Sequence, residues 1–276
     1  MSRPPHKPSG PPWPRRKPAG TTGYTPPKPP PELPEGRVRI FGYHAVEAVL
    51  DNQARHVERV LATENAEHRL QARIAARGLT AERVMPRDLD RLLGPDTVHQ
   101  GIALEVDDLP EPDIDALARQ AAPGRPLLLL DQVTDPHNVG AILRSAAAFG
   151  ACGLVMTRRH SPQLSGALAK AASGALELVP VCRVQNLART MTDLQEAGVT
   201  LIGLDSEAEQ TLEDMTWPSA PGLVLGAEGR GLRQLTRESC DRLCRIDTAS
   251  MLASLNVSNA AAVALHIAWR AGPAKR

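Results

Sequence analysis

The chain has 276 residues and a formal net charge of +1, from 32 Lys and Arg against 31 Asp and Glu. This length allows one or two domains with a sizeable core, and no apolar run reaches the roughly 18 residues of a membrane helix. The start of the chain has no continuous apolar segment of the kind that a secretory signal requires. The four cysteines are too few and too scattered for a disulfide scaffold, so we expect a soluble, cytoplasmic protein with reduced thiols.

Residues 1–36 form a Pro-rich segment that contains 13 of the 25 prolines. Residues 1–37 hold seven Lys and Arg against two Glu, whereas the remainder holds 25 basic against 29 acidic side chains. Such a composition cannot bury enough apolar surface to fold, which predicts a disordered basic tail. This tail either attracts nucleic acid in a salt-sensitive way or has no specific role.

Residues 37–107 predict a small α/β domain, and residues 108–125, rich in Asp, Pro and Gly, predict a linker. The expected helices are Val46 to Leu50 (after Gly42-Tyr43-His44), Ala66 to Arg77 and Asp88 to Leu93, and the expected strands are Val57 to Ala62 and Gly101 to Val106. Within the linker, Ile114 to Gln120 has a short helical pattern.

Residues 126–272 predict a larger α/β domain in which strands and helices alternate. The run Leu127 to Asp131 is continuously apolar, which is typical of a buried parallel strand. The other expected strands are Gly153 to Thr157, Leu176 to Val181, Thr200 to Asp205, Gly222 to Gly226 and Leu243 to Asp247. The expected helices are Asn138 to Phe149, Gln163 to Ala172, Asn186 to Ala197, Leu232 to Ser239 and Ser258 to Trp269. This alternation indicates a parallel sheet covered on both faces, with ligands at the carboxyl ends of its strands.

The first polar segment, Asp131 to Arg144, leaves a strand and opens a helix. Arg144 projects away from the apolar stripe of that helix, where a guanidinium can bind a phosphate or a carboxylate. The alternative is a solvated Arg144 and an Asn138 that only caps the helix, and His137 fits either interpretation.

The second segment, Gly222 to Gly231, is a strand that runs into a glycine-rich turn. It lacks the Lys-Ser/Thr of a Walker loop and the spacing of a dinucleotide fingerprint. Its glycines permit close backbone approach, and Glu228 is placed to orient a neighbouring Asn or Arg. The alternative for Glu228 is an exposed loop carboxylate.

The third segment, Ser254 to Asn259, has four Ser and Asn side chains before an Ala-rich run. One cap is enough for a helix, so the surplus indicates a polar ligand; the alternative is a Ser254 cap followed by a solvated first turn. Parallel topology should gather the three segments on one edge of the sheet, which predicts a site there. Cys240 and Cys244 lack a second ligand pair nearby, so we expect no metal.

These segments resemble the three ordered motifs of SpoU/TrmH-type RNA 2′-O-ribose methyltransferases. The matching residues are Asn138-Val-Gly-Ala-Ile-Leu-Arg144, Gly226-Ala-Glu-Gly-Arg-Gly-Leu232 and Ser254-Leu-Asn-Val-Ser258. The similarity extends from Phe41 to about Trp269 and includes Gly42-Tyr-His-Ala-Val and His99-Gln-Gly101. Within the family the chain most resembles the bacterial 23S rRNA guanosine-2′-O-methyltransferases.

The resemblance implies a trefoil-knotted methyltransferase domain that binds S-adenosylmethionine, although unknotted chains are the general rule. It also implies a smaller L30e-like RNA-binding domain at the N-terminal side and a homodimer with each site near the interface. It places catalytic roles on Asn138, Arg144, Glu228 and Asn256, and cofactor contacts on Leu204, Asp205, Gly226, Ile246 and Leu255. The sequence departs from the family in its Pro-rich tail and in Asp247 to Met251, where relatives more often have Pro and Gly.

The resemblance implies methyl transfer to the ribose 2′-hydroxyl of a guanosine in 23S rRNA. The alternatives are 2′-O-methylation of tRNA or of another rRNA site, and a non-catalytic RNA-binding protein of ribosome assembly. In the enzyme interpretations the site must align the hydroxyl oxygen with the methyl donor and accept the hydroxyl proton. We expect Arg144 to assist through an RNA phosphate, either by direct deprotonation or by orienting the ribose. Because arginine normally stays protonated, orientation is the simpler role.

Overall fold

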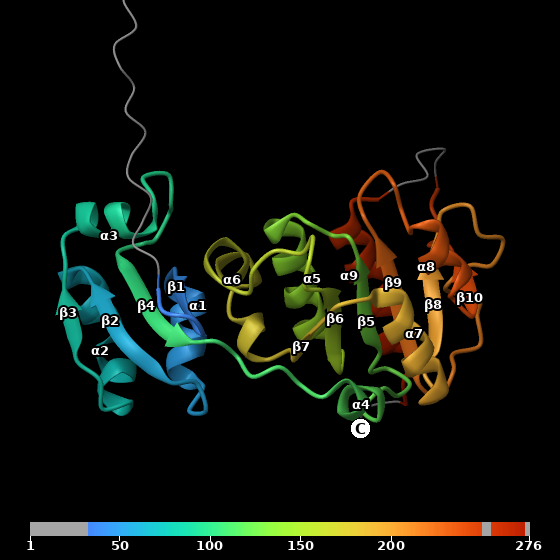
Figure 1. Ribbon diagram of the computed structural model, residues 1–276, viewed down its shortest axis with the longest axis horizontal. Coiled ribbons are helices and arrows are strands. Elements are labelled where there is room, and N and C mark those ends of the chain that lie inside the picture. The colour runs from blue at the N-terminus through green and yellow to red at the C-terminus, as the bar shows by residue number, and fades with distance from the viewer. Residues whose placement is uncertain (1–32, 250–254, 274–276) are drawn as a thin grey trace, which may run out of the picture.

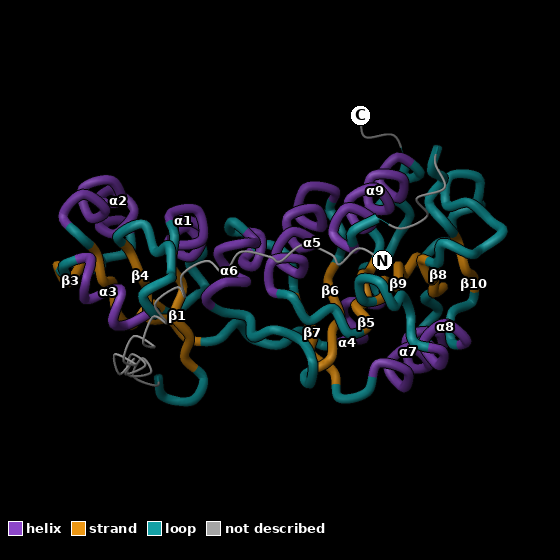
Figure 2. Tube along the Cα trace, turned by 90° about the horizontal axis from the view of Figure 1, so that it is seen from above, coloured by secondary structure: helices purple, strands orange, loops and turns teal. Residues whose placement is uncertain are grey.

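The computed structural model describes residues 33–249 and 255–273, which form two sheets with their helices along an elongated molecule (Figure 1). The first sheet has the order β1-β4-β2-β3 and mixed strand directions. Its strands are β1 (Arg37–Phe41), β2 (Val57–Ala62), β3 (Ala81–Arg83) and β4 (Ile102–Asp107). Its helices are α1 (Tyr43–Asp51), α2 (Glu64–Ala76) and α3 (Pro86–Leu93), with α1 and α2 on one side and α3 on the other (Figure 2).

The second sheet has six strands, all parallel, in the order β10-β8-β9-β5-β6-β7. These strands are β5 (Leu127–Asp131), β6 (Gly153–Thr157), β7 (Val181–Val184), β8 (Thr200–Leu204), β9 (Pro221–Gly226) and β10 (Arg242–Cys244). The central strand β5 is fully buried, as its continuous apolar run predicts. The predicted α/β class and the predicted parallel sheet are therefore confirmed.

Helices cover both faces of the six-stranded sheet (Figure 2). Helices α5 (Pro136–Phe149), α6 (Gly166–Ala172) and α9 (Val257–Arg270) lie on one face, and α4 (Ile114–Ala118), α7 (Leu187–Glu196) and α8 (Gln234–Glu238) lie on the other. The amphipathic pattern of α7 explains its packing, since Leu187, Met191 and Leu194 are buried in the core on that face. Helix α4, predicted inside a linker, also packs there through Leu117 and Ala118.

The predicted strand from Leu176 to Val181 is wrong. A 3₁₀ turn, η1 (Ala175–Glu177), occupies its first half, and β7 begins only at Val181. The reason is local: Ser173 and Gly174 are both left-handed, so the chain turns sharply at the end of α6. The apolar residues Leu176 and Val179 are buried, but neither of them belongs to a strand.

Two short strands of the first sheet, β1 and β3, were not predicted. In β1 the apolar Val38 and Ile40 alternate with Arg37 and Arg39, a period-two signal directly after the Pro-rich segment. β3 has only three residues, too few for any periodicity. Sheet pairing, and not local propensity, selects both strands.

Candidate active site

The three predicted polar segments meet at the carboxyl edge of the six-stranded sheet. Asn256 Nδ2 donates hydrogen bonds to Asn138 Oδ1 at 3.2 Å and to Glu228 Oε2 at 3.4 Å. Asn138 Nδ2 also donates to Glu228 Oε2, at 3.4 Å. We call these three residues the amide–carboxylate cluster. It joins positions 90 and 118 residues apart in sequence, as the parallel topology predicts.

Local structure fixes the two amides of the cluster. Helix α5 is capped by Asp135, whose side chain accepts from the His137 N–H at 3.0 Å, so Asn138 is not the cap and its amide is free for the cluster. Asn256 caps α9: its Oδ1 accepts from the backbone N–H and the hydroxyl of Ser258, at 2.9 and 2.6 Å. The Asn256 amide group is thereby oriented, with Nδ2 turned toward Glu228. Ser254, the alternative cap, lies outside the described residues.

Arg144 lies on α5, six residues after Asn138, and its side chain is exposed. It makes no ion pair or hydrogen bond with any residue that the structure describes, and it does not contact the amide–carboxylate cluster. Its charge is therefore available to a phosphate or to a second protein chain. The expected exposure of Arg144 on the polar side of α5 agrees with the structure.

The loop that carries Glu228 folds back on its own strand. Gly231 N donates to Ala227 O at 2.8 Å, and a Cβ added to Gly226 would lie 2.0 Å from the Gly231 carbonyl carbon. No side chain fits in that gap, so Gly226 is required by close backbone approach. The loop is thus a compact turn that presents Glu228 beside the two amides.

An ion pair anchors the far end of this loop to the neighbouring strand. Asp131, fully buried at the end of β5, accepts from the Arg233 backbone N–H at 3.0 Å and from Arg233 Nε at 2.7 Å. Arg233 Nη2 lies 2.6 Å from the same carboxylate. Several charge-assisted contacts to one buried carboxylate hold the start of α8 against β5.

A second arginine, Arg237 within α8, holds the end of β8. Arg237 Nε lies 2.6 Å from Asp205 Oδ2, while Asp205 Oδ1 accepts from the Glu207 N–H at 2.9 Å. Since β9 runs between β8 and β5, the two arginines fix the chain on both sides of the strand that leads into the Glu228 loop. The sequence did not indicate these supporting roles for Asp131, Arg233 and Arg237. The only sequence signal for the two arginines is their spacing of four residues.

A pocket of about 210 Å³ lies beside the cluster. All five predicted cofactor residues line it: Leu204, Asp205, Gly226, Ile246 and Leu255. Its apolar lining also includes Leu225, Val257 and Ala260, and its charged lining residues are Asp205, Glu228 and Arg245. Among the residues predicted to be catalytic, Glu228 lines the pocket, whereas Asn138, Arg144 and Asn256 do not.

The chemistry of this lining fits S-adenosylmethionine. Leucine, isoleucine and valine side chains offer an apolar surface for an adenine ring, and strand-end backbone groups offer hydrogen bonds to its edge. Glu228, which makes no ion pair with the described residues, suits a ligand that carries a sulfonium and an ammonium charge. The described residues contain no cluster of three or more His, Cys, Asp or Glu that could hold a metal ion.

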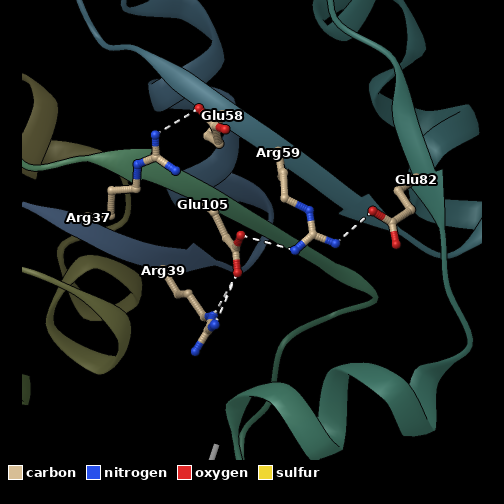
Figure 3. Close-up of polar contacts among 6 residues, drawn as sticks. All are labelled: Arg37, Arg39, Glu58, Arg59, Glu82 and Glu105. Carbon is tan, nitrogen blue, oxygen red and sulfur yellow. Dashed lines mark hydrogen bonds and ion pairs between the residues drawn. The ribbon is translucent and has the colours of Figure 1, made fainter. Parts of the chain in front are cut away.

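The arginines of the four-stranded sheet are largely neutralised. In Figure 3 a chain of ion pairs crosses β1, β4, β2 and β3: Arg39 to Glu105 at 3.1 Å, Arg59 to Glu105 at 3.2 Å and Arg59 to Glu82 at 2.7 Å. Arg37 pairs with Glu58 at 3.0 Å. Three arginines face three glutamates, so this network offers no net positive charge to a nucleic acid.

Two family models match the chain. The SpoU rRNA methylase family matches residues 125–266, and the substrate-binding domain of RNA 2′-O ribose methyltransferases matches residues 39–112. Within the described part of the chain, none of the helices has the length and apolar character needed to cross a membrane.

Curated relatives are similar over nearly their whole length. The 23S rRNA (guanosine-2′-O-)-methyltransferase RlmB of Pseudomonas syringae pv. tomato is 40% identical, with 86% of this chain and 97% of the relative covered. The RlmB protein of Ralstonia nicotianae is 42% identical, with 84% and 94% covered.

A similar solved structure is the SpoU methyltransferase AviRb from Streptomyces viridochromogenes in complex with the cofactor AdoMet. It has a TM-score of 0.72 and 26% identity, and the match covers 85% of this chain and 90% of that one. The family models match most of the chain, and the two relatives are at least 40% identical over more than four-fifths of it; the chain therefore belongs to the SpoU rRNA methylase family.

Proposed function

We propose that the protein transfers a methyl group from S-adenosylmethionine to the ribose 2′-hydroxyl of a guanosine in 23S rRNA. The observation that carries the proposal is the convergence of Asn138, Glu228 and Asn256 beside a largely apolar pocket that Glu228 itself lines. Family membership supports the reaction, and the relatives named as 23S rRNA guanosine methyltransferases, at about 40% identity, support the substrate.

In this proposal the five pocket residues hold the cofactor, which supplies a methyl group already activated on a sulfonium. The cluster residues keep the Glu228 loop in place and orient the ribose. Glu228 Oε2 is occupied by the two amides, whereas Oε1 accepts no hydrogen bond from the described residues. That oxygen is left to accept a hydrogen bond from a ribose hydroxyl, which helps to align the attacking oxygen and gives the hydroxyl proton an acceptor as the methyl group leaves the sulfonium.

Arg144 binds an RNA phosphate next to the reacting ribose and orients the sugar. Its exposed guanidinium, without a carboxylate partner among the described residues, supports this role. Arg159 and Arg230 follow β6 and β9 at the same edge of the sheet and make no ion pair with the described residues either. Two unneutralised guanidiniums at this edge, together with that of Arg144 on α5, favour a polyanionic substrate.

Substitution of Arg144 tests the mechanism. Because Arg144 is exposed and has no partner to lose, Arg144→Ala should fold normally and keep its affinity for S-adenosylmethionine in calorimetry. Methyl transfer to rRNA fragments should fall about 100-fold or more, the usual contribution of a positioned catalytic group. The matched control is Arg189→Ala, an exposed arginine of α7 on the opposite face. Near-wild-type turnover by Arg144→Ala would remove this residue from the reaction.

Mapping of 2′-O-methyl groups on RNA from a deletion strain tests the substrate. We expect one guanosine of 23S rRNA to lose its methyl group and to regain it when the gene is restored. Loss of a methyl group from tRNA or from another rRNA site would establish the alternative substrate. A folded protein that gives no heat with S-adenosylmethionine would instead favour a non-catalytic RNA-binding protein.

The proposed assembly is a cytoplasmic homodimer of knotted subunits. Exposed Val263 and Trp269 lie on α9, beside the helix α5 that carries Arg144, and a second copy of the chain would cover this apolar surface. Light scattering should give twice the chain mass for the wild type and a lower mass for Val263→Glu. An unchanged mass for Val263→Glu would place the interface elsewhere.

A further inference from the structure

A buried ionic contact joins the two sheets of the molecule. Glu177, on η1 of the six-stranded half, accepts from Arg55 Nη1 at 3.0 Å and from Asn52 Nδ2 at 2.7 Å. Arg55 and Asn52 belong to the turn between α1 and β2 of the four-stranded half. The side chains of Arg55 and Glu177 are only 1% and 4% exposed, so the contact is buried at the seam between the halves.

The turn that carries Arg55 is itself held rigidly. Arg77, at the end of α2, donates to the carbonyl oxygens of Asn52 and Arg55, both at 2.5 Å, and more weakly to that of Val49 at 3.3 Å. Asn52 Oδ1 accepts from the Ala54 N–H at 3.1 Å, which fixes its amide toward Glu177. Both groups that reach across the seam are thus oriented by their own half.

Close packing surrounds this contact. A Cβ added to Gly174, directly before η1, would lie 2.8 Å from Ala48 Cβ and 3.3 Å from His44 O on α1. A Cβ added to Gly166 would lie 3.4 Å from the Phe41 ring. The chain at Gly174 therefore approaches α1 without room for an extra side chain, whereas a Cβ at Gly166 would only touch Phe41. Figure 1 shows α6 between the two sheets.

The energetics of this contact favour orientation over stability. Arg55 Nε and Nη2 are buried without a hydrogen-bond partner among the described residues. Burial lowers the pKa of Arg55, and the charge of Glu177 opposes that shift. A buried ion pair of this kind is often no more stabilising than an apolar pair of similar volume, because both charges lose their water. The directional hydrogen bonds of the pair instead favour one relative orientation of the two halves.

We infer that the contact of Glu177 with Arg55 and Asn52 fixes the orientation of the RNA-binding half on the methyltransferase half, and so selects which nucleotide reaches the amide–carboxylate cluster. The inference rests on the proposed function for the identity of the substrate. The four-stranded half holds the RNA, the cluster receives one ribose, and the seam sets the path between them. Arg55, Asn52 and Glu177 are positioning residues and touch neither cofactor nor ribose.

Two variants of the full chain test this inference. Glu177→Gln keeps the volume and an acceptor for Asn52 but removes the charge opposite Arg55. The double variant Arg55→Met/Glu177→Met replaces the ion pair by an apolar pair, and it keeps the test valid if the single variant folds poorly. The matched control is Glu67→Gln, which breaks the ion pair of Glu67 with Arg83, 2.6 Å long and contained within the four-stranded half.

We expect both seam variants to bind S-adenosylmethionine as wild type does, within about twofold in calorimetry. Their kcat/KM for rRNA should fall at least tenfold, and 2′-O-methyl mapping should show methyl groups at neighbouring nucleotides. Small-angle scattering should show a wider distribution of shapes. The control should match the wild type in every measurement.

The inference is wrong if both seam variants methylate one nucleotide with the kcat/KM of the wild type. It is also wrong if the variants lose cofactor binding, because that result indicates a general role in stability. The scattering measurement needs no RNA. If the wild type fails to methylate 23S rRNA, the proposed function is wrong. If the seam variants give the same scattering as the wild type, the inference is wrong, whatever the substrate is.

Discussion

Two carboxylates at strand ends, Asp131 and Asp205, are each paired with an arginine, Arg233 at the N-cap of α8 and Arg237 within it. These two contacts hold the chain on either side of the loop that carries Glu228. Asp131 has no exposed surface, so its carboxylate oxygens rely on Arg233 for hydrogen bonds in place of water. Arg233 is half exposed, with 49% of its side chain accessible, which weakens the electrostatic part of the contact. The hydrogen bonds to the buried carboxylate therefore matter more than the ion pair.

Asp131→Asn should loosen the anchor of the Glu228 loop. We expect a loss of about 1.5–3 kcal/mol in the free energy of unfolding, typical of hydrogen bonds to a charged group, and weaker binding of S-adenosylmethionine. Urea unfolding and calorimetry measure the two effects, with Asp193→Asn, an exposed carboxylate of α7, as the control. Unchanged cofactor affinity would show that the loop keeps its place without Asp131.

Thiol reactivity tests the burial of the cysteines. Burial raises the pKa of Cys152 to about 11 and that of Cys240 to about 12. The thiolate is the reactive form, so at pH 8 about one Cys152 in a thousand and one Cys240 in ten thousand is reactive. Native protein should therefore react with iodoacetamide far more slowly than unfolded protein, and faster as the pH rises. Mass spectrometry of each peptide measures this; rapid native labelling would contradict the burial.

At the scale of elements, substitutions in the turn after β9 test how strongly the shape of this loop affects cofactor binding. Gly226→Ala places a Cβ 2.0 Å from the Gly231 carbonyl carbon, and backbone cannot yield as a flexible side chain does. We expect the six-stranded core to fold while cofactor affinity falls at least tenfold. Gly229→Ala is the graded comparison, because its Cβ meets nothing within 4 Å and only its φ of +75° is unfavourable, a cost of about 1 kcal/mol. Equal effects of both substitutions would exclude the steric explanation.

The elements show why some of the site could be predicted from sequence. Each of the segments around Asn138 and Glu228 follows a strand of a parallel sheet. The hydrophobic pattern locates these strands in the sequence, and the carboxyl ends of parallel strands lie at one edge of the sheet, so the two segments are expected to meet there. The contacts of Arg233 and Arg237 depend on the strand order β8-β9-β5, which no local pattern contains. The seam contact of Arg55 with Glu177 spans 122 residues and depends on the docking of two halves. Local sequence patterns therefore predict the position of the amide–carboxylate cluster, whereas the ion pairs that hold the surrounding chain depend on tertiary packing.

At the scale of the whole molecule, the charge of the N-terminal segment differs from that of the rest. Residues 1–32 hold six Lys and Arg against one Glu, while the charged network of the first sheet is balanced. The fold begins just after this segment, since Arg37 N donates to Pro34 O and Asp108 N donates to Gly36 O at 2.7 Å. A deletion that ends at residue 32 therefore keeps these two contacts.

Deletion of residues 1–32 should leave the melting temperature and the cofactor affinity unchanged and should weaken RNA binding mainly at low salt. Each cation that meets a phosphate adds about 0.7–0.9 to the slope of log K against log salt, so the slope should become shallower without the segment. Binding titrations at several salt concentrations measure the slope. A full-length variant with the six Lys and Arg changed to Gln separates charge from length, and should behave as the deletion does. If the deletion abolishes cofactor binding instead, the segment takes part in the fold, and the boundary predicted at residue 36 is wrong.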